Sequence, residues 1–184
     1  EVFQVLASIL KQNGFATTVG DEGGFAPQLH TIENAFDVLV QAIKKAGYTP
    51  GKDIAIATDI AASEFYNAKK GVYEMKTEGK TYTADELLQR YIDLQKKYPI
   101  ESIEDPFAED DWAAWKKALP KLKKKSVVVG DDFFVTNVER LERGIKEKAA
   151  KAILIKPNQI GTVSETVQAI IMAHKHGFKT SISH

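Results

Sequence analysis

The chain has 184 residues, of which 43% are hydrophobic and 27% are charged, enough for one domain with its own core. Basic and acidic residues number 25 each, so the overall charge favours neither nucleic acid nor an anionic membrane as a partner. The absence of cysteine excludes disulfides and thiolate metal sites. No apolar run reaches the roughly 20 residues that a membrane-spanning helix needs.

The first part of the chain predicts two helices. Residues 2–12 carry a helical pattern of apolar positions that stops at Asn13 and Gly14, a typical helix end. Thr31 then caps a second helix, whose apolar residues recur at the spacing of one helical face. Gly47 ends this helix.

Two further helices are marked by capping boxes. The sequence TADE at residues 83–86 opens one helix, which Pro99 stops. The sequence TVSE at residues 162–165 opens another, which runs to Gly177. Both boxes place a threonine at the cap and a glutamate three residues later, so that each side chain can bond the other's backbone.

Short apolar runs of strand length lie between the helices, at residues 54–57, 100–103, 127–129, 153–155 and 180–182. Most are apolar on both faces, which is typical of strands in a buried parallel sheet. Residues 72–82, centred on Glu78 and Gly79, predict an inserted hairpin. The repeated strand–helix unit favours a (β/α) barrel, with an open doubly wound sheet as the alternative.

A polar residue follows each of the five runs: Asp59, Glu104, Asp131, Lys156 and His184. The carboxyl ends of parallel strands meet at one edge, where parallel α/β folds bind their ligands. A single acid or lysine after a strand usually belongs to a loop or to solvent. Five such residues at successive strands indicate a site.

The expected composition of this site indicates a metal ion. Three carboxylates in one mouth repel one another unless a cation or protons neutralise them. Oxygen ligands alone suit Mg²⁺ better than Zn²⁺. A further acid, Glu22, lies in the sequence GDEGG at residues 20–24, where glycines allow a loop to fold closely over a ligand. The alternative for this segment is a flexible turn.

Six segments in this order resemble the enolase family, over essentially the whole chain. They are VGDEGGFAP at 19–27, DIAASEF at 59–65, SIEDPFAEDDW at 102–112, GDDFFVTN at 130–137, LIKPNQIG at 154–161 and SH at 183–184. The resemblance implies an α/β fold, an incomplete enolase-type TIM-like (β/α)8 barrel with about six strands and their helices. Residues 1–184 would then be part of the C-terminal catalytic barrel domain, without the N-terminal capping domain.

The resemblance also implies a ligand set for Mg²⁺, which is expected as the cofactor. The family's three carboxylate ligands match Asp59, Glu104 and Asp131. Two of them have an acidic neighbour, Asp105 beside Glu104 and Asp132 beside Asp131. In both pairs the resemblance assigns the ligand to the first residue.

The catalytic roles follow from the same resemblance. Lys156 matches the base that removes the proton from C2 of 2-phosphoglycerate, and Glu22 matches the acid that assists the loss of hydroxide from C3. Lys156, Glu104, Asp131 and His184 are expected to contact the substrate. Lys156 must be neutral to act as a base, so its pKa has to fall below the usual value of about 10.4, which burial and metal charge would favour.

The implied function is that of a lyase, a phosphopyruvate hydratase that interconverts 2-phosphoglycerate and phosphoenolpyruvate in glycolysis. The family implies a cytoplasmic homodimer, with a secondary cell-surface or secreted pool, and neither nucleic acid nor a membrane as partner. The isolated chain is expected to be inactive, to bind Mg²⁺ weakly and to fold poorly, because an unclosed barrel exposes strand edges.

Three alternatives remain open at this point. The first is another member of the same superfamily that removes an α-proton from a different carboxylate. The second is a binding role for Lys121, Lys123, Lys124 and Lys125 towards an acidic partner, against the simpler interpretation of a solvated helix end. The third is a barrel enzyme of other chemistry, which would be favoured if the strand-end acids did not converge.

Overall fold

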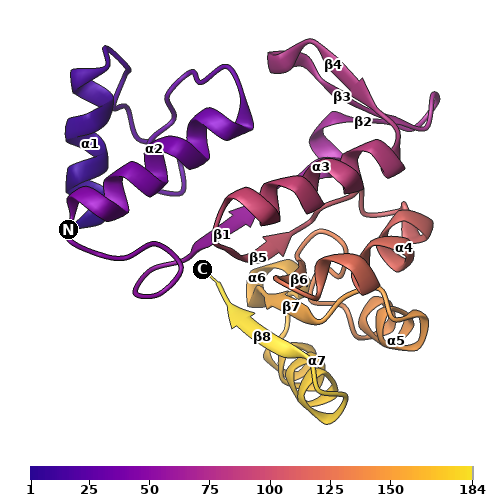
Figure 1. The fold of residues 1–184 in the computed structure, drawn as a ribbon. Coiled ribbons are helices and arrows are strands. Elements are labelled where there is room, and N and C mark those ends of the chain that lie inside the picture. The colour runs from indigo at the N-terminus through magenta and orange to yellow at the C-terminus, as the bar shows by residue number, and fades with distance from the viewer. Residues whose placement is uncertain (184) are drawn as a thin grey trace. The chain divides into compact units, whose positions relative to one another are not determined.

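The computed structural model describes residues 1–183, which divide into two compact units. The first unit contains residues 1–56 and 76–80, and the second contains residues 57–75 and the chain from residue 81 onward. Figure 1 shows the elements of both units in chain order. Within the described residues no helix has the length and apolar character that crossing a membrane requires.

The first unit is built on two packed helices, α1 (Val2–Gln12) and α2 (Ile32–Lys45). Both begin where the sequence predicts. The Thr31 hydroxyl accepts the backbone N–H of Asn34 at 3.2 Å, which confirms the expected cap. The buried side chains of the two helices are Ile9, Leu10, Phe36, Ala42 and Ile43.

The second unit is built on a five-stranded sheet in the order β1-β5-β6-β7-β8. The strands are β1 (Ile56–Asp59), β5 (Ile100–Glu104), β6 (Val127–Gly130), β7 (Ala152–Ile155) and β8 (Lys179–Ile182). Strands β5 to β8 pair in parallel, and Figure 1 shows β1 running the same way beside β5. All five predicted runs form strands, against an expectation of about six. Strand β1 begins two residues later than predicted and extends to Asp59.

Five helices connect or follow these strands: α3 (Ala84–Lys97), α4 (Trp112–Leu122), α5 (Val138–Glu147), α6 (Pro157–Ile160) and α7 (Val163–Lys175). The capping box at the start of α3 is complete, with Thr83 and Glu86 bonded to each other's backbone. Helix α7 starts after its predicted cap, Thr162, and ends two residues before Gly177. Figure 1 shows the helices following the sheet in chain order, from α3 past α4 and α5 to α7.

A smaller sheet contains the predicted hairpin. Its strands are β2 (Tyr66–Asn67), β3 (Val72–Met75) and β4 (Lys80–Tyr82), with the 3₁₀ helices η1 (Ala62–Phe65) before β2 and η2 (Lys76–Glu78) between β3 and β4. Strand β2, which the sequence pattern did not predict, pairs antiparallel with β3. Tyr73 of β3 is fully buried and donates its hydroxyl to Asp111 at 2.8 Å. The hairpin is thereby fixed to the loop that precedes α4.

The two faces of the five-stranded sheet differ in burial. Ile103, Ile153 and Ile155 are almost completely buried, whereas Glu104 and Leu154, which alternate with them, are partly exposed. A doubly wound sheet would cover both faces with helices. The one-sided burial therefore favours the incomplete barrel, in which the less buried face would line the interior.

Candidate functional site

Four of the predicted site residues stand at neighbouring strand ends. Asp59 and Glu104 are the last residues of β1 and β5, and Asp131 and Lys156 directly follow β6 and β7. The strands run the same way, so these side chains lie at one edge of the sheet, as predicted. His184, the fifth predicted residue, lies outside the described residues.

Lys156 and Asp131 form the closest pair in this group. The Lys156 Nζ lies 2.6 Å from the Asp131 Oδ2, and the two side chains are only 19% and 9% exposed. The Gln159 side-chain amide donates to the other Asp131 oxygen at 3.4 Å. Both oxygens of Asp131 therefore have a partner from the segment that follows β7.

Glu104 lies in the electrostatic field of the other strand-end groups. Burial is the largest cause that raises the pKa of the Glu104 carboxyl, and with the charges of Asp59, Asp131 and Asp105, against the effect of Lys156, it brings this pKa to about 7. A carboxyl that is held back from ionising by burial and by like charges gains from a nearby cation. The strand-end acids are therefore close enough to act on one another electrostatically.

Asp105 has a different position from its neighbour Glu104. Its backbone adopts a positive φ of 40°, and its buried carboxylate accepts two backbone N–H groups from the end of β6, those of Asp131 at 2.9 Å and Asp132 at 2.8 Å. Burial raises the pKa of Asp105 to about 7, although the two N–H groups act in the opposite direction. Asp105 thus holds the backbone of the next strand end, and Glu104 stays the candidate ligand of the pair.

The donor chemistry of Asp59, Glu104 and Asp131 suits a hard cation such as Mg²⁺, because all three offer carboxylate oxygens and Glu104 is destabilised as an anion. In their present positions, however, no three acidic or imidazole side chains among residues 1–183 are grouped closely enough to hold a metal ion. The Lys156 ammonium is the cation that neutralises Asp131. The ligand set therefore stays a prediction.

The expected depression of the Lys156 pKa depends on metal charge and stays a prediction. The hydrogen bond to Asp131 raises the pKa of Lys156 above its ordinary value, and burial opposes this effect only in part. The charges of Asp131, Asp132 and Glu104 add to the increase. The sequence showed that a lysine follows β7, but its charge state depends on which acid lies within hydrogen-bond distance.

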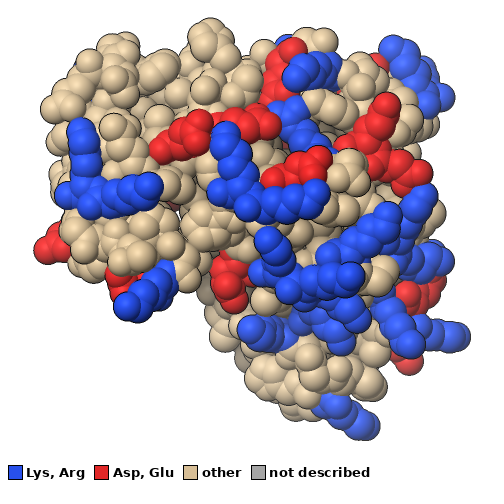
Figure 2. Space-filling model, in the orientation of Figure 1, with Lys and Arg blue, Asp and Glu red and all other residues tan. Residues whose placement is uncertain are grey.

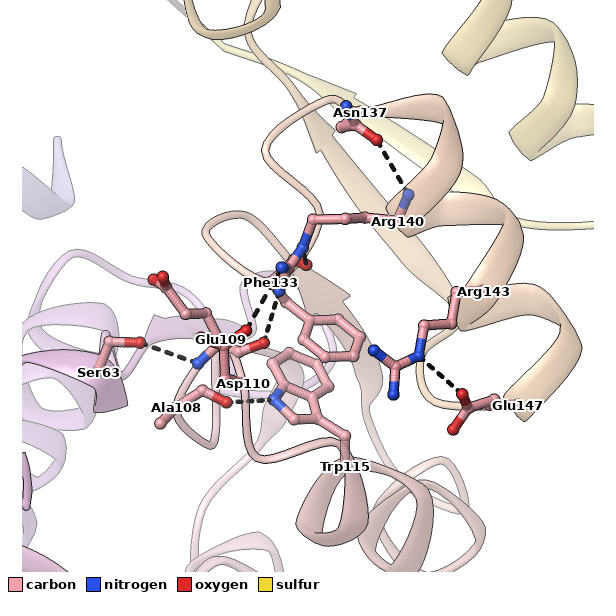
Figure 3. Close-up of polar contacts among 10 residues, drawn as sticks. All are labelled: Ser63, Ala108, Glu109, Asp110, Trp115, Phe133, Asn137, Arg140, Arg143 and Glu147. Carbon is pink, nitrogen blue, oxygen red and sulfur yellow. Dashed lines mark hydrogen bonds and ion pairs between the residues drawn. The ribbon is translucent and has the colours of Figure 1, made fainter. Parts of the chain in front are cut away.

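The loops that carry the site are tied together by Arg140 of α5 (Figure 3). Its Nε donates to the Phe133 carbonyl at 2.7 Å, and its Nη2 donates to the Glu109 carbonyl at 2.6 Å. The Glu109 N–H in turn donates to the Ser63 hydroxyl at 3.0 Å. Loops that follow three different strands, β1, β5 and β6, are therefore linked through one side chain and the backbone of Glu109.

Aromatic packing also fixes the loops that follow β5 and β6. The buried Trp115 ring stacks on Phe133, with 3.9 Å between centroids, and its Nε1 donates to the Ala108 carbonyl at 3.1 Å (Figure 3). The Arg143 guanidinium lies 3.8 Å from the centre of the Trp112 ring. Because these partners are distant in sequence, the sequence analysis did not identify the network.

Thr136 links the loop after β6 to the base candidate. It is fully buried with a positive φ of 55°, and its hydroxyl accepts the Lys156 backbone N–H at 2.9 Å. Asp105, Thr136 and Gln159 are thus site residues that the sequence analysis did not assign. The only signal for them was their position inside the segments that resemble the enolase family.

Glu22 lies in the first unit, on a tight loop. The segment is closed by a bridge between Val19 and Phe25 and by a bond from the Gly20 N–H to the Gly24 carbonyl at 2.8 Å. Gly23 has a φ of 81°, a conformation that favours glycine. Glu22 is exposed on this loop, and its catalytic role stays a prediction.

Comparison with known proteins gives two concordant results. All of residues 1–184 match the protein family described as Enolase, C-terminal TIM barrel domain. The chain is also 52% identical over 184 residues to an enolase of Natranaerobius thermophilus. This alignment covers the whole chain and 43% of that protein, so the chain spans less than half the length of the curated relative it matches.

Proposed function

Because the chain belongs to the enolase family, through its C-terminal TIM barrel domain, we propose that the whole protein is a phosphopyruvate hydratase. This lyase removes water from 2-phosphoglycerate to give phosphoenolpyruvate, reversibly, in glycolysis. The observation that carries the proposal is the pair of Lys156 and Asp131 at adjacent strand ends, beside a Glu104 carboxyl with a raised pKa.

The reaction requires one base and one acid. A proton leaves C2 of the substrate to the base, the electron pair forms the C2–C3 double bond, and hydroxide leaves C3 with a proton from the acid, as water. Lys156 is the proposed base and Glu22 the proposed acid. Lys156 can accept the proton only after its ammonium has lost a proton, which ends its ion pair with Asp131 but leaves an amine that can still donate to that carboxylate.

Asp59, Glu104 and Asp131 are the residues that would hold Mg²⁺. When bound, the ion would supply positive charge against the second negative charge that develops on the substrate carboxylate. The Lys156 backbone is fixed by Thr136, and the backbone of Asp131 is fixed by Asp105. The base and the central acid are therefore held by separate buried side chains, which supports a preorganised site.

The proposed roles are tested in a full-length enolase that carries these residues. In deuterated water, the wild-type protein should exchange the C2 proton of 2-phosphoglycerate for deuterium and should form phosphoenolpyruvate. The ultraviolet absorbance of phosphoenolpyruvate measures its formation. Lys156→Ala should lower both rates by about 10²–10⁴-fold. Glu22→Gln should lower phosphoenolpyruvate formation while C2 exchange continues. Lys175→Met, on the exposed side of α7, is the control and should retain both rates.

The assignment of Lys156 is wrong if Lys156→Ala retains wild-type exchange at C2. If the protein exchanges the α-proton of an unrelated carboxylate substrate and does not exchange the C2 proton of 2-phosphoglycerate, another member of the superfamily is favoured instead. We further propose that the protein is a homodimer, which sedimentation of the full-length protein tests, and that it is cytoplasmic, which cell fractionation tests. The isolated 184-residue chain is expected to be inactive, because it spans only 43% of the relative's length.

A further inference from the structure

A lysine-lined cavity of about 310 Å³ lies at the amino-terminal ends of the strands in the second unit. Its charged lining consists of Lys123, Lys124, Lys125, Lys151, Lys179 and Glu101. Three of the lysines come from the turn between α4 and β6, and the other two stand at the starts of β7 and β8. This lysine cavity is thus at the opposite end of the sheet from the strand-end site.

The five lysines of the cavity have no carboxylate partner among residues 1–183. Neighbouring cations on α4 differ: Lys116 pairs with Glu147 at 2.9 Å, and Lys117 pairs with Asp85 at 2.6 Å. Glu101 is the single acid in the lining. The cavity therefore concentrates positive charge that the described part of the fold does not neutralise.

The run of lysines noted in the sequence divides into two parts. Lys121 is not part of the lining; it acts, after Lys117, to lower the pKa of Asp85 on α3. Lys125 donates to the Gln95 carbonyl at 3.2 Å, which fixes its side chain at the cavity. Only the second part of the run, together with Lys151 and Lys179, forms the cavity.

We propose that the lysine cavity binds a small polyanion that carries at least two phosphate groups. Its volume is at the lower end of the range for small-molecule pockets. Each lysine offers three donors on a compact charge, which suits phosphate oxygens. Five lysines against one glutamate leave an excess charge that a monoanion would not neutralise.

A macromolecular anion is the less favoured occupant. Stable binding of a protein partner usually buries about 1,200 Å² or more of surface. The lining of a cavity of about 310 Å³ is too small to supply one side of such an interface. Lysine and arginine side chains gather over the region of α4 and α5 on the face drawn in Figure 2, which would attract anions towards this part of the molecule. The lysines that converge on one hollow from three segments indicate a compact ligand.

The probe for this proposal is inorganic pyrophosphate, titrated into the full-length protein with EDTA present and followed by calorimetry at low ionic strength. The test variant replaces Lys124, Lys151 and Lys179 with glutamine, and the control is Lys121→Gln, which removes one lysine charge outside the cavity and is matched in charge by Lys124→Gln alone. Wild-type protein and the control should bind equally. The triple variant should bind about tenfold more weakly or not at all, and added salt should weaken wild-type binding.

Equal binding by the triple variant and wild type would overturn the proposal, because pyrophosphate would then bind elsewhere, as at the strand-end site. So would the absence of binding to wild type. If a polynucleotide or an acidic peptide binds and pyrophosphate does not, the occupant is a macromolecule and the proposal is wrong. Should the triple variant unfold, Lys124→Gln alone, in an exposed turn, tests the same point. Hydratase activity is independent of all these outcomes.

Discussion

The carboxylate of Asp105 fixes the backbone of Asp131. Its Oδ1 accepts the Asp131 N–H at 2.9 Å, while its Oδ2 accepts the next N–H at 2.8 Å. Asp105 follows β5 and Asp131 follows the adjacent β6, so one buried side chain sets the position of a neighbouring strand end. Asp105, which the resemblance does not assign as a ligand, therefore sets the position of Asp131, which it does.

Replacing Asp105 with asparagine should weaken both the fold and the metal site. The amide keeps one acceptor oxygen, so one buried N–H loses its partner, at about 1–3 kcal/mol of unfolding free energy. Displacement of Asp131 should lower Mg²⁺ affinity by roughly 10–100-fold, the usual effect of losing a group that orients a ligand. Urea unfolding and calorimetric Mg²⁺ titration measure the two effects. Asp110→Asn, in the same loop with a 79% exposed side chain, is the control and should change neither by much.

Without divalent ions, stability should fall as the pH rises from about 4.5 to about 7. The pKa of Glu104 is about 7 in the folded protein, against an ordinary value of 4.5. Between these values the folded state binds more protons than the unfolded state, so raising the pH favours unfolding. The measurement is urea unfolding with EDTA across this range.

The matched variant for this pH effect is Glu104→Gln, which should show a smaller loss of stability over the same range. An unchanged slope would contradict the assignment of the effect to Glu104. Added Mg²⁺ should stabilise the wild-type protein most at the upper end of the range, where the carboxylates are ionised, because a ligand of the folded state adds its binding free energy.

Arg140→Met should destabilise the loops that carry the site. The substitution keeps the apolar stem but removes the donors to the carbonyls of Phe133 and Glu109, and a loss of about 1–3 kcal/mol in unfolding free energy is expected. Amide exchange at Glu109 should become faster. Arg143→Met, which removes only a surface pair and a ring contact, should cost less. Equal losses in the two variants would argue against the linking role of Arg140.

Gly144→Ala should destabilise the protein although alanine favours helices. A Cβ at Gly144 would lie 2.3 Å from Cε1 of Phe134, whose buried ring is flanked by Phe133 and Phe178. Overpacking of this kind costs about 1–3 kcal/mol, more than the helix gain of about 1 kcal/mol. The double variant with Phe134→Leu should recover part of the loss, because the smaller side chain leaves room. Thermal unfolding of both variants tests this coupling.

The sequence alone located the five strands of the larger sheet and four of the helices, α1, α2, α3 and α7. The cap at Thr31 and the box at Thr83 involve residues within four positions of one another, so their pattern can be seen in the chain. The apolar runs likewise marked β1 and β5 to β8, although β1 was shifted by two residues. Strand ends therefore predicted where Asp59, Glu104, Asp131 and Lys156 lie along the sheet.

Only the tertiary structure decided how these groups act on one another. The bond of Asp105 to Asp131, the link through Arg140 and the raised pKa of Lys156 all join residues more than 20 positions apart. The lysine cavity likewise brings together residues from 101 to 179. Short-range patterns determine which elements form, but distances across strand ends depend on how the strands pair. Charge states follow those distances, because burial and neighbouring charges set them.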